Sequence, residues 1–239
     1  MILKKLLINL SIRNNKIFIA TAIAILFHVI GLVGILVFNS SVIINATPLN
    51  LLLSAGLLIY TQQEKKKDFY IFLIVTIITG FIVEVIGVNT SLLFGNYNYG
   101  NVLGFKWLEV PFIIGLNWFI IIYCCGISTN TLLNNLLTKV AITPAAPLTF
   151  LKATSVITDA ATLAVLFDIL IEPVAIKLDF WHWNGDGSVP IYNYICWIII
   201  SLILLTVFHL LKFNKQNKFA INLLMIQFMF FLLLRTFLK

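Results

Sequence analysis

Seven long apolar runs constrain the fold of this chain more than any other feature of its sequence. A helix needs about 20 predominantly apolar residues to cross the hydrocarbon core of a bilayer, and each run is of that order. Hydrophobic residues occupy 61% of the 239 positions and charged residues only 10%. The sequence therefore predicts an all-α integral membrane protein, a single polytopic domain with about seven transmembrane helices. The predicted spans are about 17–37, 42–61, 69–88, 110–126, 149–172, 191–211 and 219–238.

The basic residues predict how the chain is oriented. Eleven Lys and Arg residues lie between spans on the side of the N-terminus, whereas only Lys106, Lys177 and Lys239 lie on the other side. Cytoplasmic loops carry the excess of Lys and Arg, so we expect a multi-pass protein of the plasma membrane with a cytoplasmic N-terminus. The first run is too long for a signal peptide, and no small-residue cleavage site follows it. Because the charges are dispersed, the net charge of +7 indicates topology and not a nucleic-acid partner.

The stretch 131–147 is less apolar than the predicted spans. It contains Pro144 and Pro147, so we expect an amphipathic connector at the cytoplasmic interface. Pro48, near the start of the second run, suits the first turn of a helix.

The cysteine and histidine residues argue against metal and redox chemistry. Cys124, Cys125 and Cys196 fall inside apolar runs without CxxC spacing, and the three histidines lie on separate segments. This pattern predicts no disulfide framework, no zinc or haem site and no histidine-ligated di-iron centre. The sequence also lacks a dinucleotide fingerprint and a P-loop. We therefore expect no metal and no cofactor.

An internal repeat organises the middle of the chain. The motif Tyr97-Asn98-Tyr99 begins thirteen residues after Glu84. The motif Trp181-His182-Trp183 begins thirteen residues after Asp168. In each unit a Val-Pro pair comes next, and a tryptophan, Trp118 or Trp197, lies seven residues after that proline.

Both repeat units run outward along one helix and back along the next. They cover about 80–126 and 164–211, which are predicted spans three to four and five to six. Parallel units of this kind predict a pseudo-twofold core of four helices around an axis near the membrane normal. Chance similarity within an interfacial belt of aromatic residues is the alternative.

Four acidic residues are the candidate catalytic groups. Carboxylates inside a membrane are costly and mark functional sites. No Lys or Arg lies within the interior of spans three to six, so we expect at least one acid to keep its proton at neutral pH. A satisfied helix-packing contact is the alternative for each acid. The four are Glu84, Glu109, Asp168 and Glu172, of which the last two share one helical face.

Aromatic and amide side chains surround these acids in the sequence. Ring faces attract positive charge, by up to about 2 kcal/mol or more when desolvated, so aromatic walls beside a neutral acid suit a carbocation and a long polyene. The amides can hold a water molecule or a carboxyl oxygen. Membrane anchoring and helix capping are the alternatives. The candidate substrate-binding residues are Phe94, Tyr97, Tyr99, Asn117, Trp118, Trp181, Trp183, Asn193 and Trp197.

These motifs resemble the membrane carotenoid biosynthesis protein family that includes bisanhydrobacterioruberin hydratase and the carotenoid 1',2'-hydratases. The resemblance covers about residues 80–200, whereas the first, second and last spans match only in hydropathy. It implies addition of water to the terminal carbon–carbon double bond of an acyclic carotenoid within the bilayer. Membrane lipid and other carotenoid biosynthesis enzymes are the further partners it implies. The matching stretches are Glu84–Gly87, Phe94-Gly95, Tyr97, Tyr99, Leu103-Gly104, Val110-Pro111, Asp168, Glu172-Pro173, Trp181–Trp183, Val189-Pro190, Asn193 and Trp197.

Together the residues and the resemblance predict a cofactor-independent hydratase, a hydro-lyase by class. Asp168 or Glu84 would protonate the alkene, aromatic faces would stabilise the tertiary carbocation, and the second carboxylate would activate water. A carotenoid cyclase, which shares the protonation step, remains an alternative. A proton- or cation-coupled transporter is another, and it should show a polar face through the full membrane depth.

Overall fold

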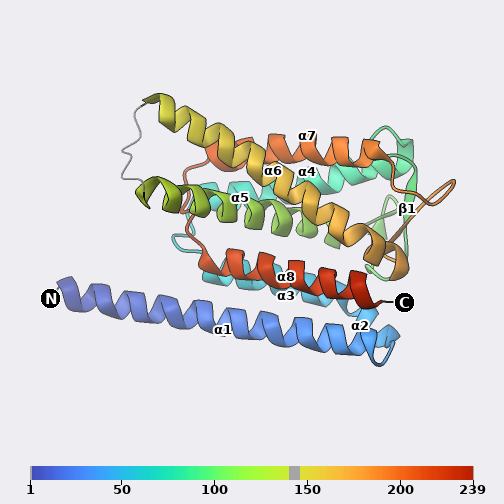
Figure 1. Ribbon diagram of the computed structural model, residues 1–239, viewed down its shortest axis with the longest axis horizontal. Helices are drawn as coiled ribbons and strands as arrows, with labels where there is room; N and C mark the ends of the chain where they lie inside the picture. The colour runs from blue at the N-terminus through green and yellow to red at the C-terminus, as the bar shows by residue number, and fades with distance from the viewer. Residues whose placement is uncertain (1, 140–145, 239) are drawn as a thin grey trace.

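The computed structural model describes residues 2–139 and 146–238, which form eight helices and two short strand pairs (Figure 1). Six of these helices are long and apolar enough to cross a membrane, and α3 is a shorter apolar helix of 15 residues. The prediction of an all-α membrane protein is therefore confirmed. The elements are α1 (Ile2–Leu36), α2 (Ser41–Asn45), α3 (Thr47–Thr61), α4 (Lys67–Thr90), β1 (Tyr97–Tyr99), β2 (Lys106–Trp107), β3 (Val110–Pro111), α5 (Ile113–Lys139), α6 (Ala146–Lys177), β4 (Trp181–Trp183), α7 (Ile191–Leu210) and α8 (Lys218–Phe237).

The helices run back and forth between two ends of the molecule. The N-terminus lies at one end, and the strands and the C-terminus lie at the other (Figure 1). Helices α4 to α7 form a bundle, and α1 packs against α8 and α3 on one side of it (Figure 1). All strand-bearing loops therefore gather over the same end of the bundle.

Two predicted segments differ from the structure. The second predicted span is divided into α2 and α3, which meet at Ala46, and Pro48 lies in the first turn of α3 as expected. The predicted connector is in part a continuation of α5, which stays helical to Lys139 because residues 131–139 contain no glycine or proline. The rest of that connector up to residue 145 lies outside the described residues.

Helix α6 continues through Pro173, beyond the predicted end of span five. Proline has no N–H, so the carbonyl of Ile169, four residues earlier, loses its helical donor. Arg235 of α8 supplies a replacement, because its Nη1 atom donates to this carbonyl at 3.0 Å. An interhelical hydrogen bond thus compensates for the interior proline.

Arg235→Leu should lower the free energy of unfolding by about 1 kcal/mol, since the Ile169 carbonyl then loses its donor. The same substitution should cost less in a Pro173→Ala background, where residue 173 regains a backbone N–H. Unfolding of the wild type, the two single variants and the double variant in detergent measures the coupling between Arg235 and Pro173. Equal losses in both backgrounds would contradict the compensation.

The β1–β4 pair has the register that a twofold axis between the repeat units requires. The strands are antiparallel and lie across the helix ends, with Asn98 opposite His182 (Figure 1). Rotation about an axis through that pair carries Tyr97 onto the position of Trp181, which is its counterpart in the sequence repeat. The remaining partners are Tyr97 with Trp183 and Tyr99 with Trp181.

Two hydrogen bonds beyond the strands follow the same axis. Gly100 N donates to the Phe180 carbonyl, and Asn184 N donates to the Asn96 carbonyl, each at 2.9 Å. The repeat relates residue 100 to 184 and residue 96 to 180, so each bond is the symmetry counterpart of the other. The twofold relation therefore extends past the aromatic motifs into the flanking backbone.

Close helix packing brings the two repeat tryptophans together. Gly80 of α4 leaves room for Trp118 of α5, because a Cβ atom at position 80 would lie only 2.5 Å from Cβ of Trp118. Small residues of this kind allow membrane helices to approach closely. Trp118 in turn stacks on Trp197 of α7, with ring centroids 4.0 Å apart and planes 13° apart.

Gly80→Ala should destabilise the protein by about 1–3 kcal/mol, because the added methyl group forces α4 away from Trp118. Gly56→Ala is the matched control, since nothing lies within 4 Å of a Cβ atom there. That substitution should leave stability unchanged or raise it by about 0.5–1 kcal/mol through helix propensity. Thermal unfolding in detergent compares the two, and equal stability of both variants would contradict this packing.

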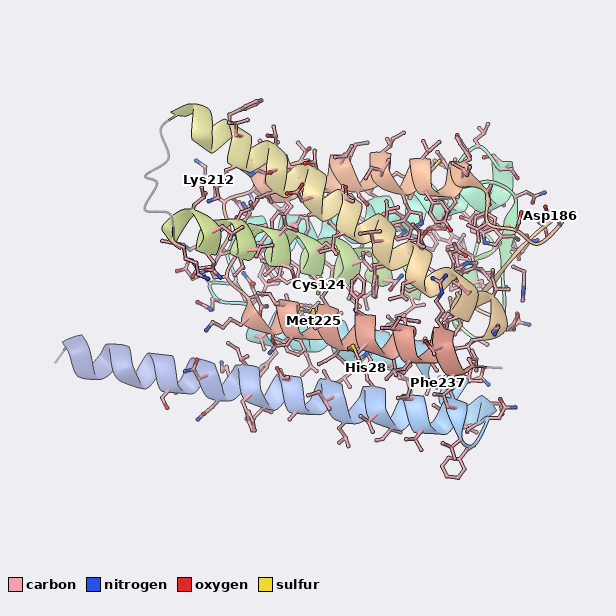
Figure 2. The ribbon with its side chains drawn as sticks, in the orientation of Figure 1. His28, Cys124, Asp186, Lys212, Met225 and Phe237 are labelled. Atoms are coloured by element: carbon pink, nitrogen blue, oxygen red, sulfur yellow. The ribbon has the colours of Figure 1, made fainter. Side chains whose placement is uncertain are left out.

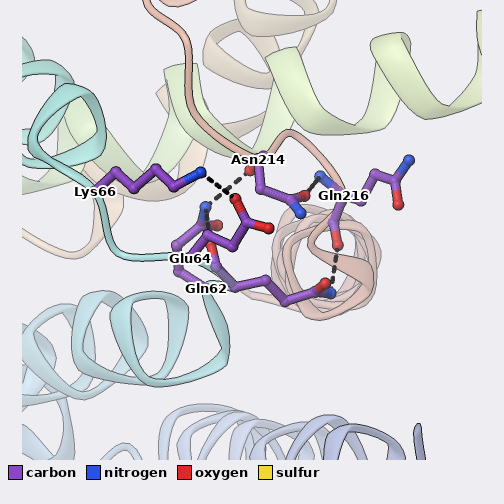
Figure 3. Close-up of polar contacts among 6 residues, drawn as sticks. Gln62, Glu64, Lys66, Asn214 and Gln216 are labelled. Atoms are coloured by element: carbon purple, nitrogen blue, oxygen red, sulfur yellow. Dashed lines mark hydrogen bonds and ion pairs between the residues drawn. The ribbon is translucent and has the colours of Figure 1, made fainter. Parts of the chain in front are cut away.

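Polar contacts join two loops at the end opposite the strands (Figure 3). Gln62, after α3, donates from Nε2 to the Asn214 carbonyl in the loop before α8 at 2.8 Å. The nearby Lys66–Glu64 ion pair, at 2.8 Å, is more than half exposed on both sides and contributes little. The loop contact holds α3 and α8 against the bundle at this end.

Candidate active site

A small cavity lies among α4 to α7, at the end of the bundle covered by β1 and β4. It measures about 30 Å³, which is room for one or two water molecules. The structure brings every predicted site residue except Glu109 to this cavity, which we call the chamber. Its lining is Glu84, Phe94, Tyr97, Tyr99, Ile114, Asn117, Trp118, Asp168, Glu172, Trp181, Trp183, Asn193 and Trp197.

Glu84 of α4 accepts three hydrogen bonds inside the chamber. Its Oε2 atom accepts from the hydroxyls of Tyr97 at 2.5 Å and Tyr99 at 2.7 Å, and its Oε1 atom accepts from Trp118 Nε1 at 2.9 Å. Burial, reinforced by the neighbouring carboxyl charge, raises the pKa of both phenols, so they remain protonated donors. Three donors suit a carboxylate that carries negative charge without a cationic partner.

Glu172 of α6 accepts the indole donors of the second repeat unit. Trp181 Nε1 and Trp183 Nε1 both donate to its Oε2 atom at 3.0 Å. The repeat pairs these tryptophans with the two tyrosines that bind Glu84, and it pairs Glu84 with Asp168. The indoles, however, reach Glu172, which lies one helical turn beyond Asp168.

Asp168 has the fewest hydrogen-bond donors of the three chamber acids. Within the described chain it accepts only from Asn193 Nδ2, at 2.9 Å from Oδ2, although its side chain is as buried as that of Glu172. The same amide lies 3.4 Å from Oε1 of Glu172, so it connects the two carboxyls. Asp168 is thus the acid whose surroundings least stabilise a negative charge.

No ion pair compensates these acids in the part of the chain that the structure describes, where the two recorded ion pairs lie elsewhere. Neutral donors from tyrosine, tryptophan and asparagine take the place of cations. The three carboxyls of the chamber therefore differ in the number of hydrogen-bond donors that they receive. The carboxyl with one donor is the easiest of the three to keep protonated.

Glu109 lies outside the chamber. It is exposed in the turn between β2 and β3, where its backbone has a φ of +64°. The tight turn directs this residue away from the bundle, although it lies only two positions before Pro111 in the sequence. Ile114 does line the chamber but was not among the predicted residues, because one isoleucine in an apolar helix carries no distinguishing signal.

The fold and the chamber define a polytopic helical membrane protein that buries carboxyl groups among aromatic rings. Residues 40–239 match the sequence model of the family described as carotenoid biosynthesis protein. The match covers most of the chain, so this protein belongs to that family. Neither a curated protein nor a solved structure shows a significant match. The family match confirms the resemblance seen in the repeat motifs and extends it to the second and last spans.

Glu84→Leu should lower the free energy of unfolding by about 3 kcal/mol or more, since two hydroxyls and one indole then lose their buried acceptor. Glu84→Gln should lose much less, because the amide oxygen still accepts and the side-chain volume is kept. Thermal unfolding in detergent distinguishes the variants, with Glu109→Gln as an exposed control expected to match the wild type. Similar stability of the Leu and Gln variants would argue against this network.

Proposed function

We propose that this protein is a carotenoid hydratase, which adds water to the terminal carbon–carbon double bond of an acyclic carotenoid end group. One observation carries the proposal: three buried carboxyls share an aromatic chamber but receive different numbers of hydrogen-bond donors. Unequal surroundings allow one carboxyl to act as an acid while another carries charge. Family membership supports the carotenoid as the substrate class.

Asp168 is the general acid in this proposal. Asp168 and Glu172 share the amide of Asn193. We propose that the two carboxyls together hold one proton. The two indole donors of Glu172 favour the charge on that residue, which leaves the proton on Asp168. Glu84, with three donors, remains a fixed anion.

Protonation creates a cation that the chamber can stabilise. The proton of Asp168 forms a bond to the less substituted alkene carbon, the π bond breaks, and the positive charge appears on the tertiary carbon. The rings of Tyr97 and Trp183, whose centroids are 5.2 Å apart, offer their π-electrons to this charge. The anionic Glu84 adds electrostatic stabilisation in a site of low dielectric constant.

Water then captures the cation. Its oxygen bonds to the tertiary carbon while Glu172 accepts a proton, and transfer of that proton to Asp168 restores the starting state. The net change is one water molecule added, so the reaction needs no oxidant, reductant or cofactor. The chamber has room for water but not for a carotenoid end group, and it must therefore widen when substrate binds.

The alternatives receive less support. A cyclase shares the protonation step, but space for water beside the acids favours capture by water. A transporter needs a polar path through the membrane, whereas Phe72, Phe119 and Phe208 are fully buried in the core beyond the chamber. We also propose a plasma-membrane location with a cytoplasmic N-terminus, supported by the basic residues at that end.

Expression in cells that accumulate lycopene tests the activity through mass analysis of the pigments. We expect a product heavier by one water molecule. Asp168→Asn should lower its formation at least about 100-fold, the scale of general-acid catalysis. Glu84→Gln should also lower it at least about 100-fold, through lost electrostatic stabilisation of the cation, whereas the exposed Glu109→Gln should not. A pigment of unchanged mass with altered absorption would indicate cyclisation. Unchanged pigments, or full activity of both chamber variants, would contradict the proposal.

A further inference from the structure

A second cavity lies between α1, α2, α3 and α8, beside the end of α6. It measures about 360 Å³, which is in the range of sites that hold small molecules. Its lining is mostly apolar and runs from exposed residues such as Leu49 to buried ones such as Ile35, so it extends inward from the lipid-facing surface. Two polar side chains of the lining come from facing helices, His28 of α1 and Gln227 of α8, and the other two, Thr47 and Asn50, belong to α3. Figure 2 shows His28 in the space between α1 and α8.

Gln227 is a buried polar group without a partner. Only 5% of the residue is exposed, and its Oε1 atom accepts no hydrogen bond from any residue that the structure describes. A buried acceptor left unpaired in an apolar environment costs free energy. Gln227 Oε1 therefore offers a free acceptor to the donor group of a ligand in the cavity.

His28 presents a second acceptor to the same cavity. Its Nδ1 atom lies 2.7 Å from the carbonyl of Ala24, a contact that requires hydrogen on Nδ1. In the neutral ring this tautomer leaves Nε2 as an acceptor. The ring is held edge-on against Phe230 of α8, at a centroid distance of 5.3 Å. The orientation of His28 is therefore set by its own helix and by α8.

The chemistry of this lining specifies the ligand. A hydroxyl group has one hydrogen to donate, and either Gln227 Oε1 or His28 Nε2 can accept it. The lining contains no Asp, Glu, Lys or Arg that would pair with a charged group. A plain lipid chain would fill the space but leave Gln227 unpaired. The matching ligand is a long apolar chain that carries a hydroxyl.

The cavity also adjoins the chamber. Phe180 lines the cavity, and the next residue, Trp181, lines the chamber, with their rings 6.3 Å apart. We propose that this second cavity binds the hydroxyl-bearing end of an acyclic carotenoid, the tertiary alcohol produced in the chamber. The identity of this ligand rests on the proposed function, whereas its hydroxyl group and apolar chain follow from the cavity.

Binding of two polyenes to the purified full-length protein tests this proposal. The probes are lycopene and its monohydrated tertiary alcohol, and quenching of tryptophan fluorescence reports binding. The Asp168→Asn variant serves as the parent protein, so that no probe is converted during the titration. The alcohol should bind about tenfold more tightly than lycopene, which corresponds to one hydrogen bond.

Gln227→Leu should remove most of the preference for the alcohol and leave lycopene binding unchanged, and adding His28→Phe should remove what remains. Asn222→Leu is the matched control. It removes a 2.9 Å hydrogen bond from Asn222 Nδ2 to Thr21 Oγ1 between the same two helices, and neither residue lines the cavity. This control should keep the preference.

Equal affinity of the parent for both polyenes would overturn the proposal, as would equal weakening of both probes by Gln227→Leu. The outcome is separable from that of the pigment assay. If no water is added to lycopene but the alcohol is still preferred through Gln227, the cavity assignment stands and the hydratase proposal fails. If water is added but no preference is found, the chamber assignment stands alone.

Discussion

The structure of the chamber depends on the cost of placing carboxyl groups inside a membrane without cations. Such groups must be protonated or surrounded by donors, because the hydrocarbon core offers no water to stabilise their charge. Here β1 and β4 carry four of the donors, two tyrosine hydroxyls and two tryptophan indoles, and Trp118 and Asn193 of the helices supply the others. The register of the short strand pair across the helix ends therefore positions its four donors against Glu84 and Glu172.

The two repeat units pair symmetrically through β1 and β4, but their aromatic motifs donate hydrogen bonds to acids at different positions. In the first unit the aromatic motif binds the acid of the repeat, Glu84, whereas in the second it binds Glu172 and leaves Asp168 with one amide donor. A symmetric scaffold thereby creates unlike carboxyls, and our mechanism depends on that difference.

Much of the site could be predicted from the sequence, because two of its acids and three pairs of its aromatic residues occupy matching positions in two helix pairs. Matching spacings from Glu84 and Asp168 to their aromatic motifs indicated that these groups lie at one end of the bundle, and the cavity lining agrees. Glu109 shows the limit of such reasoning. Its sequence position beside span four suggested the chamber, but a turn with positive φ values places it in the exposed loop. Turn geometry depends on backbone contacts that a spacing pattern does not contain.

The sequence by itself determined the membrane class, the alternation of the helices, the repeat and the set of acids and aromatic residues. Each of these follows from composition or from spacing along the chain. Only the tertiary structure decided which donor reaches which carboxyl, how Arg235 replaces the donor lost at Pro173, and that Gln227 faces a cavity unpaired. These features depend on how far each helix is rotated about its axis and on contacts between distant segments. Apolar helices in lipid carry no amphipathic pattern strong enough to specify the rotation of each helix or its contacts with distant segments.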